Sequence, residues 1–330
     1  MSNAEAHPVE LHAGHAPCPR DAAGHPVVEV LRSRAVPLGG PRAMTVRRTL
    51  PQKPRSLIGA WCFVDHYGPD DVSVTGGMDV PPHPHTGLQT VSWLFSGEIE
   101  HRDSGGVHAL VRPGELNLMT GGHGICHSEV ATPATTVLHG TQLWIALPDE
   151  SRDAPRDFQH FAPEPVDLAG ARVRVFLGEL AAVASPVRTF TPLVGAELTL
   201  ASHARLELAV PVTFEHGLLV DTGAVRLGAT ALARGDLGYV GTGVSTLTLT
   251  NPTDAPARAV LLGGAPFTEE IAMWWNFVGR SHDEIVAFHD AWRQESDRFG
   301  RVEGYRGAVA RLPAPPLPNA RILPRRTPPH

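Results

Sequence analysis

The fold of this chain is decided by two stretches of sequence, Pro81-Pro82-His83-Pro84-His85-Thr86-Gly87 and Gly121-Gly122-His123-Gly124-Ile125-Cys126-His127-Ser128-Glu129. Each contains two metal-ligand residues separated by one residue: His83 with His85, and His127 with Glu129. Side chains at positions i and i+2 of a β-strand point to the same face, about 6.5–7 Å apart, whereas on a helix they diverge. Because a metal–ligand bond is only about 2.0–2.2 Å long, two such pairs on facing strands can meet at one ion. The pattern predicts a site of three histidines and one carboxylate inside an all-β barrel.

The neighbours of the two pairs refine this prediction. Cys126 is one residue from His127, so in a strand it faces away from the ion and is expected in the core. We expect His123 at the pocket rim, with metal ligation as an open alternative. The glycines around it free the backbone from regular strand geometry, so the alternation of side chains does not fix the side to which His123 points. His101 and His108 flank a loop and are expected at the surface or as outer supports of the site. The alternative to a metal site is a set of four hydrogen-bonded core residues, but two pairs preorganised by proline and glycine favour metal binding.

The composition limits the class of protein. The chain has 330 residues, enough for two domains, and its 33 glycines and 31 prolines favour many short strands joined by turns. The net charge of −6 provides no basic field, so direct nucleic-acid binding is not expected. The three cysteines lack CxxC spacing and predict reduced thiols. There is neither a signal-peptide pattern nor a run of about 18 apolar residues, so we expect a cytoplasmic monomer without a membrane span.

Short apolar runs punctuated by glycine and proline divide the chain into four parts. Residues 1–26 are rich in histidine, proline and alanine and are expected to form a flexible extension. Residues 27–155 are expected to form the metal-binding barrel. Residues 156–300 repeat the strand rhythm and are expected to form a second barrel, which suggests a duplication. Residues 301–330 are expected to be a Pro/Arg-rich tail.

The end of the second half departs from the strand rhythm. Ser281-His282-Asp283-Glu284 begins a stretch with a capping box and an apolar stripe, which predicts one amphipathic helix over roughly residues 281–297. Just before it, Met273–Val278 is strongly apolar and aromatic. We interpret this segment as a packing cluster between the two barrels, rather than as a platform for a substrate.

These residues resemble the cupin superfamily and, more closely, the pirin family. The resemblance covers about residues 28–295 and includes the following motifs: Pro82-His83-Pro84-His85-Thr86-Gly87, Pro113-Gly114-Glu115, Met119–Glu129, Gln142-Leu143-Trp144, Leu261-Leu262-Gly263-Gly264 and Met273–Val278. It implies an all-β bicupin, in which two double-stranded β-helix barrels pack face to face with one C-terminal helix, iron in the N-terminal barrel and a degenerate C-terminal barrel. No HxH pair follows residue 165, so one metal ion per chain is expected.

Two positions depart from the resemblance. Gln89 stands where many cupins have a glutamate ligand, and Thr86 stands where many pirins have a basic residue. In pirins the ligand carboxylate resembles the one that Glu129 supplies, so the predicted ligand set remains His83, His85, His127 and Glu129. Gln89 weakens any mechanism that needs a base at that position.

Three imidazoles and one carboxylate suit Fe(II), and Mn, Co, Ni, Cu or Zn could also bind. The resemblance implies a metal-dependent dioxygenase acting on a flavonol of the quercetin type, with a small aromatic substrate and O₂ as partners. Glu129 is then a ligand and the candidate catalytic proton acceptor. The alternative is a non-enzymatic, iron-dependent redox sensor that binds a protein partner, either a transcription factor or a metabolic enzyme. A roomy cavity over the metal would favour the enzyme.

Overall fold

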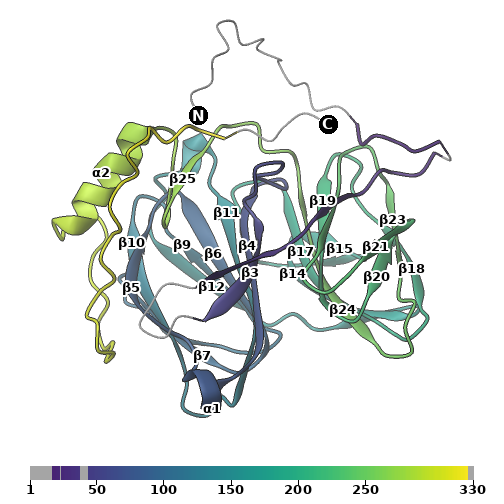
Figure 1. Ribbon diagram of the computed structural model, residues 1–330, viewed down its shortest axis with the longest axis horizontal. Coiled ribbons are helices and arrows are strands. Elements are labelled where there is room, and N and C mark those ends of the chain that lie inside the picture. The colour runs from purple at the N-terminus through teal and green to yellow at the C-terminus, as the bar shows by residue number, and fades with distance from the viewer. Residues whose placement is uncertain (1–16, 23, 38–43, 326–330) are drawn as a thin grey trace, which may run out of the picture.

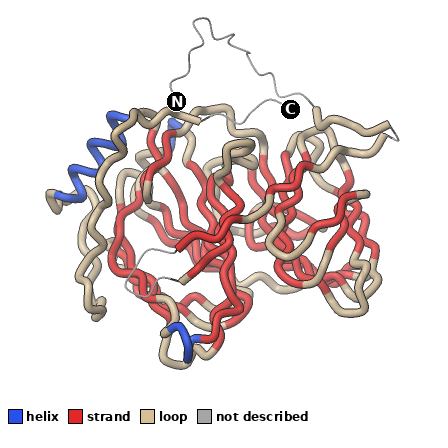
Figure 2. The backbone as a smooth tube through the Cα atoms, in the orientation of Figure 1, coloured by secondary structure: helices blue, strands red, loops and turns tan. Residues whose placement is uncertain are grey.

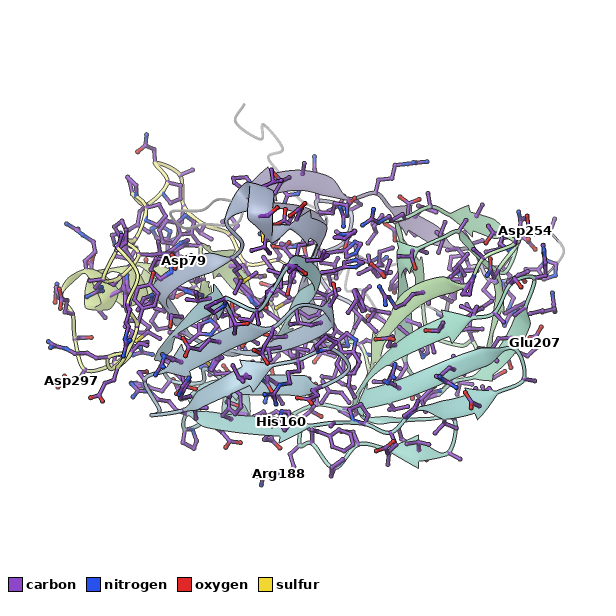
Figure 3. All side chains as sticks on the ribbon, turned by 90° about the horizontal axis from the view of Figure 1, so that it is seen from below. Asp79, His160, Arg188, Glu207, Asp254 and Asp297 are labelled. Atoms are coloured by element: carbon purple, nitrogen blue, oxygen red, sulfur yellow. The ribbon has the colours of Figure 1, made fainter. Side chains whose placement is uncertain are left out.

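The computed structural model describes residues 17–22, 24–37 and 44–325, and two β-barrels dominate it (Figure 1). Strands account for 49% and helices for 6% of the described residues. Helices lie only at the margins of the barrels, as Figure 2 shows. Seen from below, the first barrel lies between the C-terminal segment that carries Asp297 and the second barrel, whose far end carries Glu207 and Asp254 (Figure 3). The predicted bicupin fold is confirmed.

The first barrel is built from a seven-stranded and a four-stranded antiparallel sheet. The larger sheet contains, in spatial order, β12 (Asp157–Phe161), β9 (Leu116–Thr120), β6 (Leu88–Ser96), β11 (Val137–Ala146), β4 (Trp61–Asp71), β3 (Thr45–Leu50) and β2 (Arg34–Pro37). The smaller sheet contains β5 (Asp79–His85), β10 (Ile125–Ala131), β7 (Ile99–Asp103) and β8 (His108–Val111). The short helix α1 (Val72–Thr75) follows β4, and the 3₁₀ turn η1 (Asp149–Ser151) follows β11.

The second barrel repeats this arrangement. Its larger sheet contains β1 (Glu29–Leu31), β22 (Leu237–Val240), β19 (Glu215–Thr222), β24 (Ala257–Gly264), β17 (Leu193–Leu200), β14 (Ala171–Leu177) and β13 (Val166–Leu168). Its smaller sheet contains β18 (Arg205–Ala209), β23 (Thr246–Thr250), β20 (Val225–Leu227) and β21 (Thr230–Leu232), and β15 (Glu179–Leu180) pairs separately with β16 (Val183–Ala184).

Two strands cross the predicted boundary between residues 155 and 156. β1 lies in the segment assigned to the first barrel, yet it pairs with β22 of the second. β12 lies in the segment assigned to the second barrel, yet it pairs with β9 of the first. Both assignments were wrong because strand rhythm shows that a strand exists but not which sheet it joins. The first barrel therefore extends to Phe161, and β1 ties the N-terminal segment to the second barrel.

The interface between the barrels is one continuous apolar core. A single cluster of buried side chains includes Trp61 and Trp93 from the first barrel and Phe176 and Tyr239 from the second. The rings of Trp93 and Phe176 lie 4.6 Å apart. Burying aromatic side chains of this size removes about 150–250 Å² each from water, which explains why the barrels hold together.

Carboxylates of the second barrel cross this core and accept hydrogen bonds from the first. Glu197 accepts from Trp93 Nε1 at 2.8 Å, and Glu215 accepts from the backbone N–H of Gly59 at 2.8 Å. Each carboxylate is almost fully buried. A buried charge is costly unless it is hydrogen-bonded, so these contacts, which add to those from Arg174 and Tyr239 of the second barrel, favour this register of the two barrels.

After β24 the chain returns to the first barrel. The hairpin of β25 (Ala272–Trp274) and β26 (Phe277–Gly279) leads into helix α2 (His282–Arg293), which lies against the outer side of that barrel (Figure 1). Ser281 caps α2 by accepting from the Glu284 N–H, as the capping box predicts. The helix ends at Arg293, four residues earlier than expected, and Glu295 has a left-handed φ of 53°. Among the described residues no helix is long and apolar enough to cross a membrane.

Most of the aromatic segment Met273–Val278 packs against the first barrel, whereas Val278 lies in the core between the barrels and Met273 packs against that core. Phe277 packs with Trp292 of α2 and with Phe299 in a cluster against the first barrel, and Trp274 and Trp275 are only partly buried. The interpretation as an inter-barrel cluster therefore holds for Met273 and Val278 but not for the three aromatic side chains, because the segment folds back beside β5, where the Val278 N–H donates to Thr86 O.

The two ends of the described chain are held against the barrels. Cys18 is buried on the second barrel and its N–H donates to Thr242 O, so this part of the expected flexible extension is packed. Residues 1–16 and 23 lie outside the described residues. Between residues 301 and 325, the described part of the tail, there is no helix or strand, yet the Leu312 N–H donates to Pro82 O in β5 and Trp292 Nε1 donates to Leu312 O.

Candidate metal centre

Strands β5 and β10 bring the two predicted ligand pairs together. They pair antiparallel with His127 opposite His83 and Ile125 opposite His85, so the three imidazoles share one face. The register shifts between His127 and Glu129, where β10 carries a bulge. All four side chains are buried, with 6% or less of their surface exposed.

The three imidazoles present their Nε2 atoms to one another. The His83 Nδ1 lies 2.9 Å from Pro81 O, and the His85 Nδ1 lies 3.2 Å from Asn276 O. A carbonyl oxygen can only accept, so each Nδ1 carries the ring hydrogen and each Nε2 has a free lone pair. The His85 Nε2 lies 3.0 Å from the His127 Nε2. Two nitrogens bound about 2.1 Å from one ion at a right angle are separated by about 3.0 Å, against about 3.4 Å in a tetrahedral site.

Burial keeps these rings neutral. It lowers the pKa of His83 to about 4 and holds the pKa of His85 and His127 well below the ordinary value. A metal ligand must be an unprotonated imidazole, so the site is ready to bind an ion at neutral pH. The donor set and its spacing fit a metal ion with octahedral coordination.

A buried pair on β7, His101 and Asp103, orients His127. The Asp103 Oδ2 lies 3.2 Å from the His101 Nε2, and the His101 Nδ1 lies 3.3 Å from the His127 Nδ1. An ionised carboxylate only accepts, so His101 carries its hydrogen on Nε2 and accepts from His127 through Nδ1. This leaves the His127 Nε2 free for an ion. Carboxylate–histidine relays of this kind fix the tautomer of metal ligands.

His101 is therefore a support of the site and not a surface residue. The sequence contains a signal for it, since His101-Arg102-Asp103 has the same one-residue spacing as the two ligand pairs. The register of β7 with β10 places Asp103 opposite His127 and His101 opposite Glu129. His108, by contrast, is exposed and pairs with Glu100 at the surface.

Glu129 lies beside His127 rather than among all three imidazoles. Its carboxylate, His127 and His101 offer ligand atoms that lie within 4.8 Å of one another. The Ser92 hydroxyl lies 3.1 Å from Glu129 Oε1 and 3.1 Å from the side-chain oxygen of Gln142. Burial raises the pKa of Glu129, while nearby His101 and the hydrogen bond from Ser92 oppose this shift. The carboxyl group is therefore better able to hold a proton than an exposed glutamate.

A cavity of about 370 Å³ opens beside these groups. Its wall includes His83, His85 and Glu129 on the metal side and three aromatic side chains, Phe63, Trp144 and Trp275. This volume lies within the range of small-molecule sites, about 300–1,000 Å³.

The aromatic wall continues outward from His85. Trp144 lies edge-on to His85 with ring centroids 5.2 Å apart, and it stacks on Phe63 at 4.0 Å. The guanidinium of Arg48 covers the Phe63 ring at 4.3 Å and forms two 2.7 Å hydrogen bonds with Asp65. The cavity therefore offers flat apolar surface near His83 and His85, together with one cation that is paired with a carboxylate.

Comparison with known proteins agrees with this architecture. A family model described as Pirin matches residues 43–145, and one described as Pirin C-terminal cupin domain matches residues 195–300. The chain belongs to the pirin family. It is 44% identical over 293 residues to the Pseudomonas aeruginosa protein named "Putative quercetin 2,3-dioxygenase PA1205", covering 88% of this chain and 91% of that protein.

Two further relatives are similar over most of the chain. This pirin is 33% identical over 260 residues to a pirin-like protein of Caulobacter vibrioides, covering 75% of this chain and 88% of that protein. A crystal structure of quercetin 2,3-dioxygenase from Acinetobacter baumannii superposes with a TM-score of 0.84 at 37% identity, covering 89% of this chain and 96% of that one.

The remaining residues singled out in this pirin lie outside the group of three histidines. Cys126 is buried, burial raises the pKa of its thiol to about 11, and its Sγ contacts Gly300 O, as expected of a core cysteine. His123 is exposed near Asp153. Gln89 is buried and its amide donates to Thr120 Oγ1 at 3.0 Å, while Thr86 lies beside Val278 O.

A second buried group of this pirin lies at the barrel interface and has no local signal in the sequence. The His66 and His139 Nε2 atoms both contact Oδ1 of Asp221 in the second barrel, at 2.7 and 2.5 Å. The His66 Nδ1 accepts from Arg47 Nε at 3.2 Å, so its ring hydrogen sits on Nε2 and points at the carboxylate. Arg258 binds the other oxygen at 2.6 Å. The group is thus a hydrogen-bonded network in which His66 has no lone pair left for an ion.

Proposed function

We propose that this pirin is a metal-dependent dioxygenase for flavonol-type substrates, with Fe(II) held by His83, His85, His127 and Glu129. The observation that carries the proposal is the convergence of His83, His85 and His127, two of which line a cavity with an aromatic wall. The names of the relatives from P. aeruginosa and A. baumannii supply the substrate class.

The donor set suits the proposed metal. Three neutral imidazoles and one carboxylate are ligands of intermediate hardness, and the 3.0 Å separation of two Nε2 atoms matches neighbouring octahedral positions. When bound, an Fe(II) ion supplies redox chemistry and open coordination positions at which a hydroxyl-bearing substrate can meet O₂.

The protein residues have two tasks in this proposal. Glu129 accepts the proton of the substrate hydroxyl, a role that suits a buried carboxyl with a raised pKa. Ser92 donates to Glu129 Oε1 and holds the carboxylate towards His127. The flat rings of Phe63, Trp144 and Trp275 orient an aromatic substrate and exclude water around the reacting atoms.

The cavity also bears on the alternative function. A redox sensor needs only a buried ion and a surface that responds to it, whereas a substrate needs space beside the ligands. A volume of about 370 Å³ next to His83, His85 and Glu129 favours the enzyme.

The test is reconstitution of metal-free protein with Fe(II) under anaerobic conditions, followed by oxygen uptake with a panel of flavonols and catechols. We expect uptake that is matched by loss of one flavonol and that requires bound metal. A His127→Ala protein given the same Fe(II) is the control for reaction by free iron. Equal uptake by the two proteins, or no uptake with any flavonol, would refute the proposal.

A further inference from the structure

The turn between β25 and β26 has an unusual backbone. Trp274 pairs with Phe277, so Trp275 and Asn276 form a two-residue hairpin loop. Trp275 has a φ of 51°, in the left-handed region that a bulky side chain rarely adopts. In hairpin loops with positive φ at the first loop position, glycine is the preferred residue there. A tryptophan at this position therefore costs backbone energy that glycine would not.

The Trp275 ring packs at the edge of the aromatic cluster around Phe277 but is not enclosed by it. The ring centroid of Trp275 lies 5.5 Å from that of Phe277 and 6.2 Å from that of Trp274, yet the side chain stays partly exposed. Strained residues persist where the surrounding structure holds them, and they concentrate at ligand sites. The location of the Trp275 side chain can therefore show which contact the strained backbone serves.

Trp275 lies in the wall of the cavity that His83, His85 and Glu129 also line. The next residue, Asn276, accepts a hydrogen bond from His85 Nδ1 at 3.2 Å. Two residues farther on, the Val278 N–H donates to Thr86 O at 3.1 Å and anchors β26 to the end of β5. The same turn therefore fixes a metal ligand and presents an indole to the space beside it.

We propose that Trp275 is a substrate-contacting residue that recognises planar aromatic chelators, and that its strained backbone is retained for this contact. The inference rests on the proposed function for the cavity, and it adds the residue that selects the substrate class. Trp144 lines the same cavity from β11, so aromatic surface reaches it from two distant parts of the chain. A non-aromatic chelator of the same metal gains nothing from either ring.

The first part of the test measures the backbone strain. Trp275→Gly should unfold at a higher temperature than Trp275→Ala, because glycine adopts a φ of 51° without strain. Trp274, a strand residue that does not line the cavity, is the matched control. There the order should reverse, with Trp274→Gly unfolding at a lower temperature than Trp274→Ala. The same order at both positions would overturn the claim of strain.

The second part measures ligand binding without turnover. Wild type, Trp275→Gly, Trp275→Ala and Trp274→Ala are loaded with Ni(II), and the Kd values of quercetin, catechol and oxalate are measured anaerobically. Both Trp275 variants should bind quercetin and catechol about tenfold more weakly, and oxalate within a factor of two of wild type. Trp274→Ala should resemble wild type.

Unchanged quercetin and catechol Kd values in both Trp275 variants would overturn the inference, as would an equal loss for oxalate. A wild type that binds quercetin through Trp275 but consumes no O₂ with Fe(II) would refute the proposed oxygenase and leave this contact established. The two failures are therefore distinguishable.

Discussion

Mild acid should weaken the interface between the barrels through His66. Burial lowers the pKa of this side chain from 6.5 to about 4, against the hydrogen bond that it makes to Asp221. The folded pKa lies below the unfolded one, so the unfolded chain binds more protons between these values. Stability from this group is therefore complete above about pH 6.5 and is lost as the pH falls towards 4.

The magnitude follows from the two pKa values. Integrating the difference in proton binding between pH 7 and pH 5 gives a loss of about 2 kcal/mol in the free energy of unfolding from His66 alone. The side chain is fully buried, so solvent does not screen the effect. Other buried histidines, such as His83, add losses of their own.

A matched substitution isolates the contribution of His66. Glutamine keeps one donor for Asp221 and one acceptor for Arg47 but cannot titrate. Urea unfolding of the metal-free proteins at pH 7, 6 and 5 should show His66→Gln losing about 2 kcal/mol less than wild type over this range. His203→Gln, at an exposed histidine, should follow wild type. Parallel curves for wild type and His66→Gln would refute the reasoning.

Three further predictions concern the metal centre. Alanine at any one of the three converging histidines should strongly reduce bound metal, measured by elemental analysis after dialysis; full occupancy would remove that residue from the ligand set. Glu129→Gln should retain part of the metal, because an oxygen donor remains, but lose oxygen uptake; turnover equal to wild type would exclude Glu129 as the proton acceptor. His101→Phe should weaken metal affinity about 10- to 100-fold in competition with a chromophoric chelator, whereas exposed His108→Phe should not, and equal affinities would contradict the proposed relay.

The convergence of His83, His85 and His127 could be predicted because the information for it is local. Residues i and i+2 of a strand lie on the same face in any fold. The spacing alone therefore predicts that His83 and His85 lie on one face. The helix could be predicted for the same reason, since Ser281 and Glu284 lie within one turn. The C-terminal end of this helix could not be predicted, because the helix ends where the following tail begins to pack against the rest of the protein.

The parts that were missed depend on contacts between distant segments. His66, His139 and Asp221 meet only because β4 and β11 pack on β19, and nothing near any one of them shows this. Trp274 and Trp275 signalled packing but not the packing partner, since aromatic composition is the same in an inter-barrel core and in a cavity wall. Asp103 differs from these residues, because its one-residue spacing from His101 is a local signal of the same kind as the His83/His85 spacing.

The order in which the chain is synthesised has a consequence for the cavity. All four proposed ligands lie before residue 130, whereas Trp275, Asn276 and Leu312, which close the cavity, follow the second barrel. Domains fold from the N-terminus as the ribosome extends the chain. The first barrel can therefore display its ligands while the segment that covers them does not yet exist, and an ion arriving then meets a wider opening than one that reaches the finished protein. We expect a product ending before residue 270 to exchange metal faster than the full chain.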